Sequence, residues 1–348
     1  MNRKPSIKDV AKKAGLSLST VSLVINNKSR VSKETRDKVK KIVSELNYHP
    51  QRSGRFLASK LSGNIGFILT EEHFSKSEPF YTRIFLGTEF EARKSNYYVL
   101  LTTVNFNVKE TEEIPRFLLE SNVDGVIIAG KIGSSWIDYI RERNLPLLLV
   151  DFEKLDKGVS SVLIDNFEGA KLAVTHLAKG GHKKIGFIGG DIEHPSIRER
   201  YAGFRHTVNS LNLSLSDNYI CITEPETQIV NGYRAAKKIF QNKSNVPSAI
   251  FAANDAMAVG CIRFLKESGI RIPEDVAIIG FDNVEMGFLS EPRLTTINVH
   301  REEIGSIAVK RMVEMIKEKT DVKTKTITNV ELVVRESCGI KLNNPEKD

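Results

Sequence analysis

From residue 64 onward, short apolar runs alternate with stretches of helical periodicity, and this alternation restricts the fold more than any other feature of the chain. Uninterrupted apolar runs are typical of strands buried on both faces, and parallel strands need helical connections between them. The pattern therefore predicts an α/β fold built from βαβ units on parallel sheets. Seven runs over about 280 residues are too many for one small lobe, so two similar lobes are expected. The runs are 65–69, 98–101, 125–129, 147–150, 185–188, 249–252 and 276–279.

Positive charge is concentrated at the start of the chain. Residues 1–60 carry fifteen Lys and Arg against four Asp and Glu, whereas the remaining residues carry 36 against 39, out of 51 and 43 in all. A short basic segment joined to a nearly neutral body is typical of a protein that binds the phosphate backbone of nucleic acid at one end and has another task at the other.

Three short helical patterns follow one another in this basic segment. Ser6 and Asp9 have the spacing of a capping box, and Gly15 predicts the end of the first helix. Ser17 predicts the N-cap of a second helix after a tight turn, and a third helix is expected from Ser32. This is the geometry of a helix-turn-helix, whose second helix enters the major groove of DNA; a generic three-helix bundle with a solvated basic face is the alternative. The outward residues of the second helix would be Leu18, Ser19, Ser22 and Leu23.

Polar side chains follow several of the predicted strands. In open α/β sheets, ligands bind outside the carboxyl ends of the strands, so polar groups there predict a pocket for a hydroxyl-rich molecule. Asp255 is expected to cap the next helix, and Thr70 equally fits a turn. Two of the acidic groups, Asp151 and Asp282, need hydrogen-bond donors. The polar residues after the strands are Thr70, Asp151, Asn254, Asp255 and Asp282.

Several classes of protein lack the residues they would need. No uncharged apolar run reaches about eighteen residues and none follows the start, so neither a membrane span nor an export signal is predicted, and a cytoplasmic protein is expected. Cys221, Cys261 and Cys338 lie far apart, which predicts buried free thiols and neither a disulfide framework nor a metal site. The string 125–131 formally begins a P-loop but continues with Ile132, so a buried strand end is expected. With no catalytic constellation, neither an enzyme nor a cofactor is predicted.

The basic segment also contains a specific set of residues: Ile7 to Ala11, Gly15 to Ser17, Ser19 to Ser22, Asn26, Val31-Ser32, Thr35-Arg36, and Leu46 to Tyr48 with Pro50. This set closely resembles the headpiece of the lactose-repressor/galactose-repressor (LacI/GalR) family. The resemblance continues through the core, at Gly181-His182, Asn254-Asp255 and Gly280 to Asp282. It implies a transcription regulator with a DNA-binding headpiece (1–48), a hinge helix or linker (49–62) and an effector-binding core (63–348).

The resemblance assigns roles within the second helix. Thr20 and Ser22 would hold phosphates or base edges of double-stranded operator DNA, while Leu18, Ser19 and Leu23 would read the operator. Family members commonly carry Arg at position 23, where Leu offers only apolar contact, for instance to a thymine methyl. The operator half-site is therefore expected to differ from the commonest family sequence.

The hinge would fold on the minor groove and insert Leu57 between base pairs. Gly54 stands where the family usually has Ala and would weaken this helix by about 1 kcal/mol, so the hinge is expected to order only on the operator. The DNA-binding residues implied altogether are Ser17, Leu18, Ser19, Thr20, Ser22, Leu23, Asn26, Arg30, Tyr48, Arg52, Arg55 and Leu57.

For the core, the resemblance implies a periplasmic-binding-protein-like fold with two lobes, three crossovers and an effector cleft between the lobes. The first lobe is expected at about 63–162 and 293–323, and the second at about 163–292 and 324–340. Arg200 aligns with the effector-binding Arg of the family and would supply the donor that Asp151 and Asp282 need, with a solvated helix charge as the alternative. The effector-binding residues implied are Thr70, Phe80, Tyr81, Asp151, Arg200, Asn254 and Asp282.

The expected effector is a small polar molecule, and the resemblance together with the polar strand ends favours a sugar. Phe80 and Tyr81 would face the sugar ring, although core packing explains them nearly as well. No aromatic residue stands at Thr227, where some members use one. A nucleobase or a protein co-repressor is the alternative effector, and the resemblance allows an inducer or a co-repressor.

A homodimer on a pseudo-palindromic operator is expected, without the leucine heptads of a tetramer. Two other classes share part of this pattern. A helix-turn-helix protein fused to a sugar kinase would show phosphate-binding glycine loops, and a secreted solute-binding protein would need an export signal.

Overall fold

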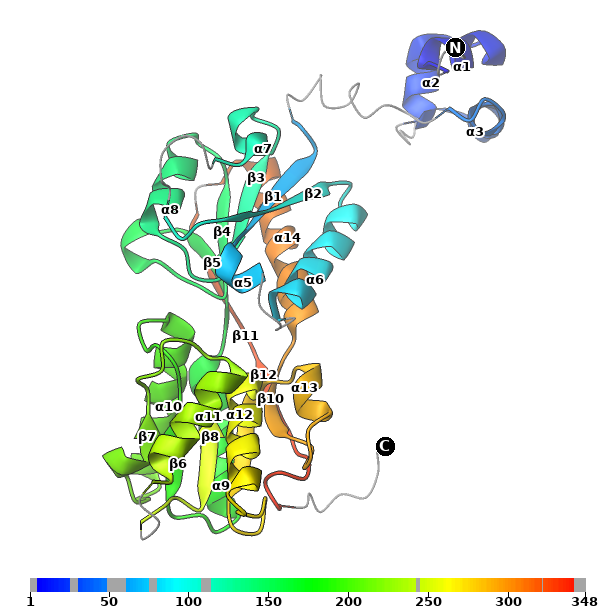
Figure 1. The fold of residues 1–348 in the computed structure, drawn as a ribbon. Coiled ribbons are helices and arrows are strands. Elements are labelled where there is room, and N and C mark those ends of the chain that lie inside the picture. Colours follow the sequence, from blue (N-terminus) through cyan, green and yellow to red (C-terminus); the bar gives the residue numbers. More distant parts are fainter. Residues whose placement is uncertain are drawn as a thin grey trace. The chain divides into compact units, whose positions relative to one another are not determined.

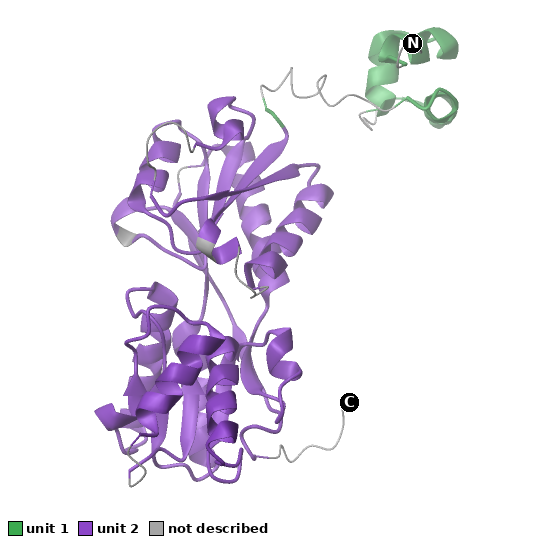
Figure 2. Cartoon of the chain, in the orientation of Figure 1, with its two compact units in different colours: residues 1–62 green, residues 63–348 purple. Residues whose placement is uncertain are grey.

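The computed structural model describes residues 5–25, 31–48, 61–74, 80–107, 114–241, 245–320 and 322–340. The chain divides into two compact units, residues 1–62 and residues 63–348 (Figure 2). No helix among the described residues is long and apolar enough to cross a membrane.

The first unit is a bundle of three helices, α1 (Ile7–Ala14), α2 (Leu18–Ile25) and α3 (Lys33–Glu45). The capping box of α1 is present, because the Ser6 backbone N–H donates to Asp9 Oδ2 at 2.7 Å, and Gly15 ends the helix in the left-handed conformation at φ 64°. Ser32 caps α3 by accepting a hydrogen bond from the Thr35 backbone N–H. The predicted helix-turn-helix is confirmed. Its core consists of Val10, Ala11, Ala14, Val21, Val24, Val39, Ile42 and Tyr48.

The first lobe of the second unit has a six-stranded parallel sheet in the order β11-β5-β4-β3-β1-β2. Helices α6 and α14, far apart in the sequence, pack side by side against this sheet (Figure 1). The strands are β1 (Asn64–Thr70), β2 (Tyr98–Val104), β3 (Gly125–Ala129), β4 (Leu147–Val150), β5 (Ser160–Ile164) and β11 (Lys325–Thr328). The helices are α5 (Glu71–Phe74), α6 (Phe80–Lys94), α7 (Arg116–Leu119), α8 (Ser134–Arg141), α14 (Arg301–Glu318) and the 3-10 turn Leu155–Lys157.

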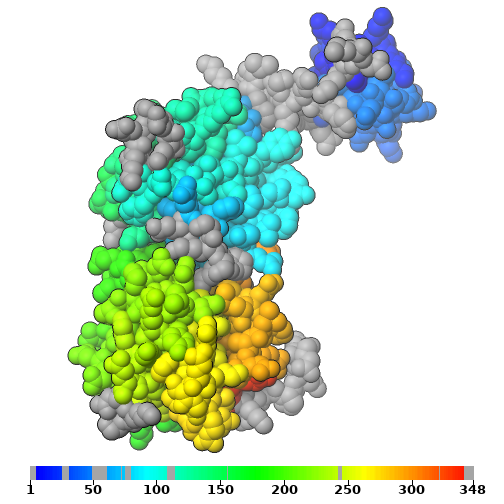
Figure 3. Space-filling view, viewed as in Figure 1, coloured from blue at the N-terminus to red at the C-terminus, as the bar shows by residue number. Residues whose placement is uncertain are grey.

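The second lobe repeats this plan with the strand order β12-β10-β9-β8-β6-β7, in which β12 runs antiparallel to β10 and the other pairs are parallel. In the space-filling view, α12 (yellow) and the segment around α13 (orange) lie on the same face of this lobe (Figure 3). The strands are β6 (Ile185–Ile188), β7 (Ile220–Cys221), β8 (Ala249–Ala252), β9 (Ala277–Asp282), β10 (Thr295–Val299) and β12 (Val330–Val333). The helices are α9 (Asn166–Lys179), α10 (Pro195–Ser210), α11 (Ile229–Ile239), α12 (Asp255–Glu267), α13 (Glu285–Phe288) and the 3-10 turn Asp217–Tyr219.

The predicted fold class is confirmed, and all seven apolar runs are strands. The predicted lobe boundaries differ from the strand pairing. Segment 293–323 was expected in the first lobe; its helix α14 does pack against α6 of that lobe, but its strand β10 pairs with β9 of the second, with Thr295 opposite Ile279. Segment 324–340 was expected in the second lobe; its strand β12 does pair with β10 of that lobe, but its strand β11 pairs with β5 of the first, with Lys325 opposite Ser161. Strands β10 and β11 are short, with polar residues, so no apolar run in the sequence indicated which sheet they join.

Candidate functional site

A cavity of about 400 Å³ lies between the two lobes of the second unit, outside the carboxyl ends of strands from both sheets. We call it the central cavity. Six of the seven residues predicted to bind an effector line it, and only Thr70 does not. These six are Phe80, Tyr81, Asp151, Arg200, Asn254 and Asp282.

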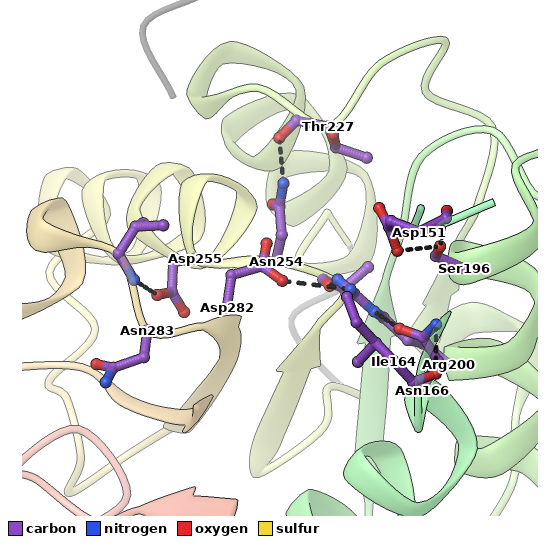
Figure 4. Close-up of polar contacts among 12 residues, drawn as sticks. Asp151, Ile164, Asn166, Ser196, Arg200, Thr227, Asn254, Asp255, Asp282 and Asn283 are labelled. Atoms are coloured by element: carbon purple, nitrogen blue, oxygen red, sulfur yellow. Dashed lines mark hydrogen bonds and ion pairs between the residues drawn. The ribbon is translucent and has the colours of Figure 1, made fainter. Parts of the chain in front are cut away.

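Arg200 is fixed by partners on several elements of the second lobe. Its Nε donates to Asn166 Oδ1 at 2.7 Å and its Nη1 to the Ala253 carbonyl at 2.6 Å, while Nη2 lies 3.2 Å from Asp282 Oδ1 (Figure 4). The guanidinium carbon stands 3.7 Å from the centroid of the Phe281 ring. Because Arg200 is only 4% exposed, the alternative of a solvated helix charge is excluded. Its planar guanidinium is therefore fixed where it can donate hydrogen bonds to a ligand in the cavity.

Asp151 joins the two lobes. It follows β4 with φ 57°, and its Oδ2 accepts from the Tyr81 hydroxyl of the first lobe at 2.9 Å. Its Oδ1 accepts from the Ser196 hydroxyl of the second lobe at 3.1 Å (Figure 4). Burial raises the pKa of Asp151 to about 6, although the positive charge of Arg200 opposes this. The expectation that Arg200 donates to both carboxylates is therefore wrong for Asp151, whose donors are two hydroxyls.

Two polar atoms of the cavity lining remain without a hydrogen bond from any described residue. One is Asp282 Oδ1, which has the Arg200 guanidinium nearby as an ion pair but no well-directed donor. The other is Nδ1 of His194. Burial, with the charges of His73 and Arg200, lowers the pKa of His194 to about 3, so its ring is neutral near pH 7. Buried polar atoms of this kind are normally satisfied, so the pair marks where ligand hydroxyl groups can bind.

Asn254, rather than Asp255, caps α12. The Asn254 Oδ1 accepts from the Met257 backbone N–H at 2.9 Å, and its Nδ2 donates to the Thr227 carbonyl at 3.1 Å. The predicted cap at Asp255 is therefore wrong by one residue. Asp255 instead accepts from the Val284 backbone N–H at 2.8 Å and from the Thr296 hydroxyl, and burial raises its pKa to about 8. It ties α12 to the segment that follows Asp282.

Thr70 is the predicted effector residue that lies away from the cavity. Its hydroxyl is 2.9 Å from His73 Nδ1, so it orients a ring that does line the cavity. Phe80 and Tyr81 meet edge to face at 5.1 Å and both line the cavity. Sequence reasoning missed His73, Lys131, Asp191, His194 and Ser196. The position just after a predicted strand could have indicated Asp191, which lies three residues beyond β6, but not His194 or Ser196, which lie six residues or more beyond it.

The second helix of the first unit presents the predicted recognition residues. Leu18 is 46% exposed and Ser19 is exposed, while Ser22 and Leu23 are half-buried. Ser17 Oγ accepts from the Thr20 backbone N–H at 3.1 Å and lies within 2.9 Å of the Thr20 hydroxyl. These hydroxyls gather at the N-terminus of α2, where backbone N–H groups favour phosphate.

The ring of Tyr48 packs into the three-helix core and burial raises its pKa, while its predicted contact with DNA stays a prediction. The other predicted DNA-binding residues, Asn26, Arg30, Arg52, Arg55 and Leu57, lie outside the described residues.

A helix-turn-helix unit joined to a two-lobed core with a central cavity defines a class of ligand-responsive DNA-binding regulators. Residues 6–51 match the lacI family of bacterial regulatory proteins, and residues 174–338 match the periplasmic binding protein-like domain. The chain is 33% identical over 341 residues to the HTH-type transcriptional repressor PurR of Pasteurella multocida (strain Pm70), covering 97% of this chain and 99% of that repressor. It is 32% identical to the PurR repressor of Vibrio vulnificus (strain CMCP6), covering 95% and 98%.

Comparison with solved structures gives the same family. The Lac repressor dimer bound to operator and the anti-inducer ONPF matches with a TM-score of 0.76 and 28% identity, over 97% of this chain and 99% of that one. The complex of the transcriptional regulator CelR with cellobiose matches with a TM-score of 0.71 and 27% identity, over 96% and 99%. The chain belongs to the LacI family, and it is a DNA-binding transcriptional repressor.

Proposed function

We propose that a small, hydroxyl-rich effector, a sugar, binds in the central cavity and switches the affinity of this repressor for its operator. The observation that carries the proposal is the set of buried polar groups that meet there from both lobes. Asp151, Arg200 and Asp282 offer acceptors and a donor, while Asp282 Oδ1 and His194 Nδ1 lack hydrogen bonds that a ligand would supply. Like other members of this family, the repressor would act without catalysis, in the cytoplasm.

A sugar fits this lining better than a nucleobase. Sugar hydroxyls donate to carboxylates and accept from a guanidinium, and sugar rings pack against aromatic side chains. Phe80 and Tyr81 stand at 86° to each other and Thr227 supplies no ring, so these residues do not form the pair of parallel rings that would hold a flat base from both sides. The similar CelR structure was solved with cellobiose.

Effector binding would change operator affinity by changing the arrangement of the two lobes. An effector that touches Asp151 from the first lobe and Arg200 from the second binds most tightly when the lobes are closed around it, and its differential affinity shifts their arrangement. β1 follows the first unit directly in the chain, so movement of the first lobe changes where that unit is anchored.

We further propose a homodimer, because one helix-turn-helix reads only a few base pairs and the similar Lac repressor binds its operator as a dimer. Apolar side chains exposed on the second unit, including Phe90, Tyr98 and Leu289, are candidates for the interface. Analytical ultracentrifugation tests this, and a monomer at micromolar concentration would contradict it.

The effector site is tested with Arg200→Ala. Removing the guanidinium leaves Asp282 buried without its ion pair and removes the planar donor, so we expect effector affinity to fall about a hundredfold. Electrophoretic mobility shift with operator DNA, combined with calorimetry against neutral sugars and purine nucleobases, measures both response and affinity. Arg205→Ala, an exposed change on the same helix α10, is the matched control.

If Arg200→Ala keeps both effector affinity and operator response, the central cavity is not the effector site. If purine nucleobases change the affinity of the repressor for its operator and sugars do not, the effector belongs to the alternative class, the nucleobases.

A further inference from the structure

A second cavity, of about 740 Å³, adjoins the central cavity. We call it the adjacent cavity. Phe106 and Lys131 of the first lobe line both cavities, so the two spaces share one wall. Like the central cavity, the adjacent cavity is lined from both lobes, by residues of α8 and by the first turns of α10.

The side chains of the shared wall make only weak contacts with the rest of the protein. Lys131 Nζ lies 3.8 Å from Asp191 Oδ2, which is an ion pair between the lobes but longer than a hydrogen bond. The two side chains are 29% and 47% exposed, and exposed pairs of this kind contribute little stability. Phe106 is 41% exposed. A ligand that extends from the central cavity would therefore meet side chains that move at small cost.

The lining of the adjacent cavity suits a sugar ring. Ser134 and Ser135 bring hydroxyls to the N-terminus of α8, and Asn107 brings an amide. Phe106 supplies exposed apolar ring surface, while Phe152, which also lines the cavity, is mostly buried in the core of the first lobe. Hydroxyl, amide and aromatic groups together are the usual lining for an uncharged carbohydrate.

Helix α10 connects the two cavities. Ser196 and Arg200 face the central cavity, whereas Arg198 and Glu199 line the adjacent one. Asn166 joins the two sets, because its Nδ2 donates to Glu199 Oε2 at 3.5 Å and its Oδ1 accepts from Arg200 Nε at 2.7 Å. A ligand ring bound against Glu199 would be sensed through Asn166 by the residue that holds the first ring.

The charge of the two linings disfavours a phosphorylated ligand. The basic residues among the described lining are Lys131, Lys154, Arg198 and Arg200, and seven acidic residues outnumber them. Two of these cations are already paired, Lys131 with Asp191 and Arg200 with Asp282.

From these observations we propose that the effector is an uncharged disaccharide or longer glycoside, with one ring in the central cavity and the next in the adjacent cavity. The inference rests on the proposed effector site and adds the length and charge of the ligand.

The experiment is calorimetry on the full-length repressor. The probes are cellobiose, maltose, lactose and sucrose, each compared with its constituent monosaccharides and their 6-phosphates. We expect at least one disaccharide to bind about tenfold or more tightly than either constituent, and no phosphate to bind more tightly than its parent sugar.

Ser134→Trp fills the adjacent cavity from the first residue of α8, and Ser268→Trp, exposed at the end of α12, is the control. Ser134→Trp is expected to remove the disaccharide gain and to leave monosaccharide affinity within about twofold. Arg198 is exposed and lines the adjacent cavity only. Arg198→Ala removes a hydrogen-bond donor without adding volume, so it also tests whether the adjacent cavity supplies the gain in disaccharide affinity.

The outcomes separate the two proposals. If a monosaccharide binds as tightly as every disaccharide that contains it, or if Ser134→Trp and Arg198→Ala both keep the gain, the adjacent cavity holds no ring and only the central site stands. Tighter binding of a 6-phosphate overturns the charge argument. If no sugar of either length binds, both proposals are wrong.

Discussion

At the scale of single residues, the chemistry of the central cavity depends on carboxylates held out of water. Asp151 has no direct cationic partner; its two oxygens each accept one hydrogen bond, from Tyr81 and from Ser196, and each has a further lone pair for a ligand. Asp282 pairs with Arg200, and burial raises its pKa while that arginine lowers it. A ligand hydroxyl that approaches Asp151 would therefore donate to a poorly solvated acceptor, where a hydrogen bond to a charged group is worth about 1.5 to 3 kcal/mol.

This arrangement predicts a pH-dependent effector response. The pKa of Asp151 is raised by burial from 3.8 to about 6, so the group is half ionised near pH 6, is mostly a carboxylate at pH 7.5 and is protonated as the pH falls well below 6. Effector affinity, measured by calorimetry between about pH 7.5 and 5, should fall for the wild type. Asp151→Asn should bind about tenfold more weakly at pH 7.5, with a flat profile.

The effect on folding has the opposite sign. Because the folded-state pKa of Asp151 is raised, the unfolded chain loses this proton first, and the contribution of the group to stability declines as the pH rises from 3.8 to about 6. Stability must therefore be measured separately from affinity. Asp217→Asn, an exposed change away from both cavities, is the control. A wild-type affinity that is constant across the range, or equal slopes for wild type and Asp151→Asn, would contradict this role.

At the scale of helices and strands, the sequence was informative where one residue pattern decided the structure. Six of the seven uninterrupted apolar runs became inner strands, where both faces are buried, whereas the run 98–101 became β2 at the edge of its sheet, with Tyr98 and Leu101 exposed. Strands β5, β10, β11 and β12 were not predicted, because they carry polar residues, and β7 is only two residues long.

The residues of the central cavity were also predictable only where a local pattern marked them. Asp151 and Asp282 follow apolar runs, and they were located because ligands bind outside the carboxyl ends of strands. His194 and Ser196 lie six residues or more beyond β6, and their approach to the first lobe depends on how the lobes meet, which no local pattern contains.

Helix contact in the first lobe is one such feature that the pattern did not show. Gly87 of α6 and Gly305 of α14 lie where the helices touch, and a Cβ on Gly305 would stand 2.1 Å from the Ile84 carbonyl oxygen. Gly305→Ala should therefore lower the free energy of unfolding by about 1 to 3 kcal/mol, because backbone on the facing helix cannot move aside. Chemical denaturation measures it against Lys310→Ala, an exposed change on the same helix. Equal stability of the two variants would show that the helices separate without cost.

At the scale of the whole molecule, charge and chemistry are divided between two units with separate cores. The first unit contains the excess of positive charge, and the second is slightly acidic and contains both cavities. DNA affinity and effector affinity should therefore be separable by cutting the chain between the units.

Residues 63–348 expressed alone are expected to bind the effector as the full chain does and to leave operator DNA unshifted. For the full chain, operator binding releases counterions from the phosphates that Lys and Arg neutralise, so affinity should fall steeply with salt. With about six phosphate contacts, the loss between 50 and 200 mM salt is about a thousandfold, measured by fluorescence anisotropy on a labelled operator. A salt-independent affinity of the full chain, or an equal operator shift by residues 63–348, would mean that DNA is bound by the second unit. The division of labour between a basic headpiece and a sensing core would then be wrong, because the acidic unit would be performing both tasks.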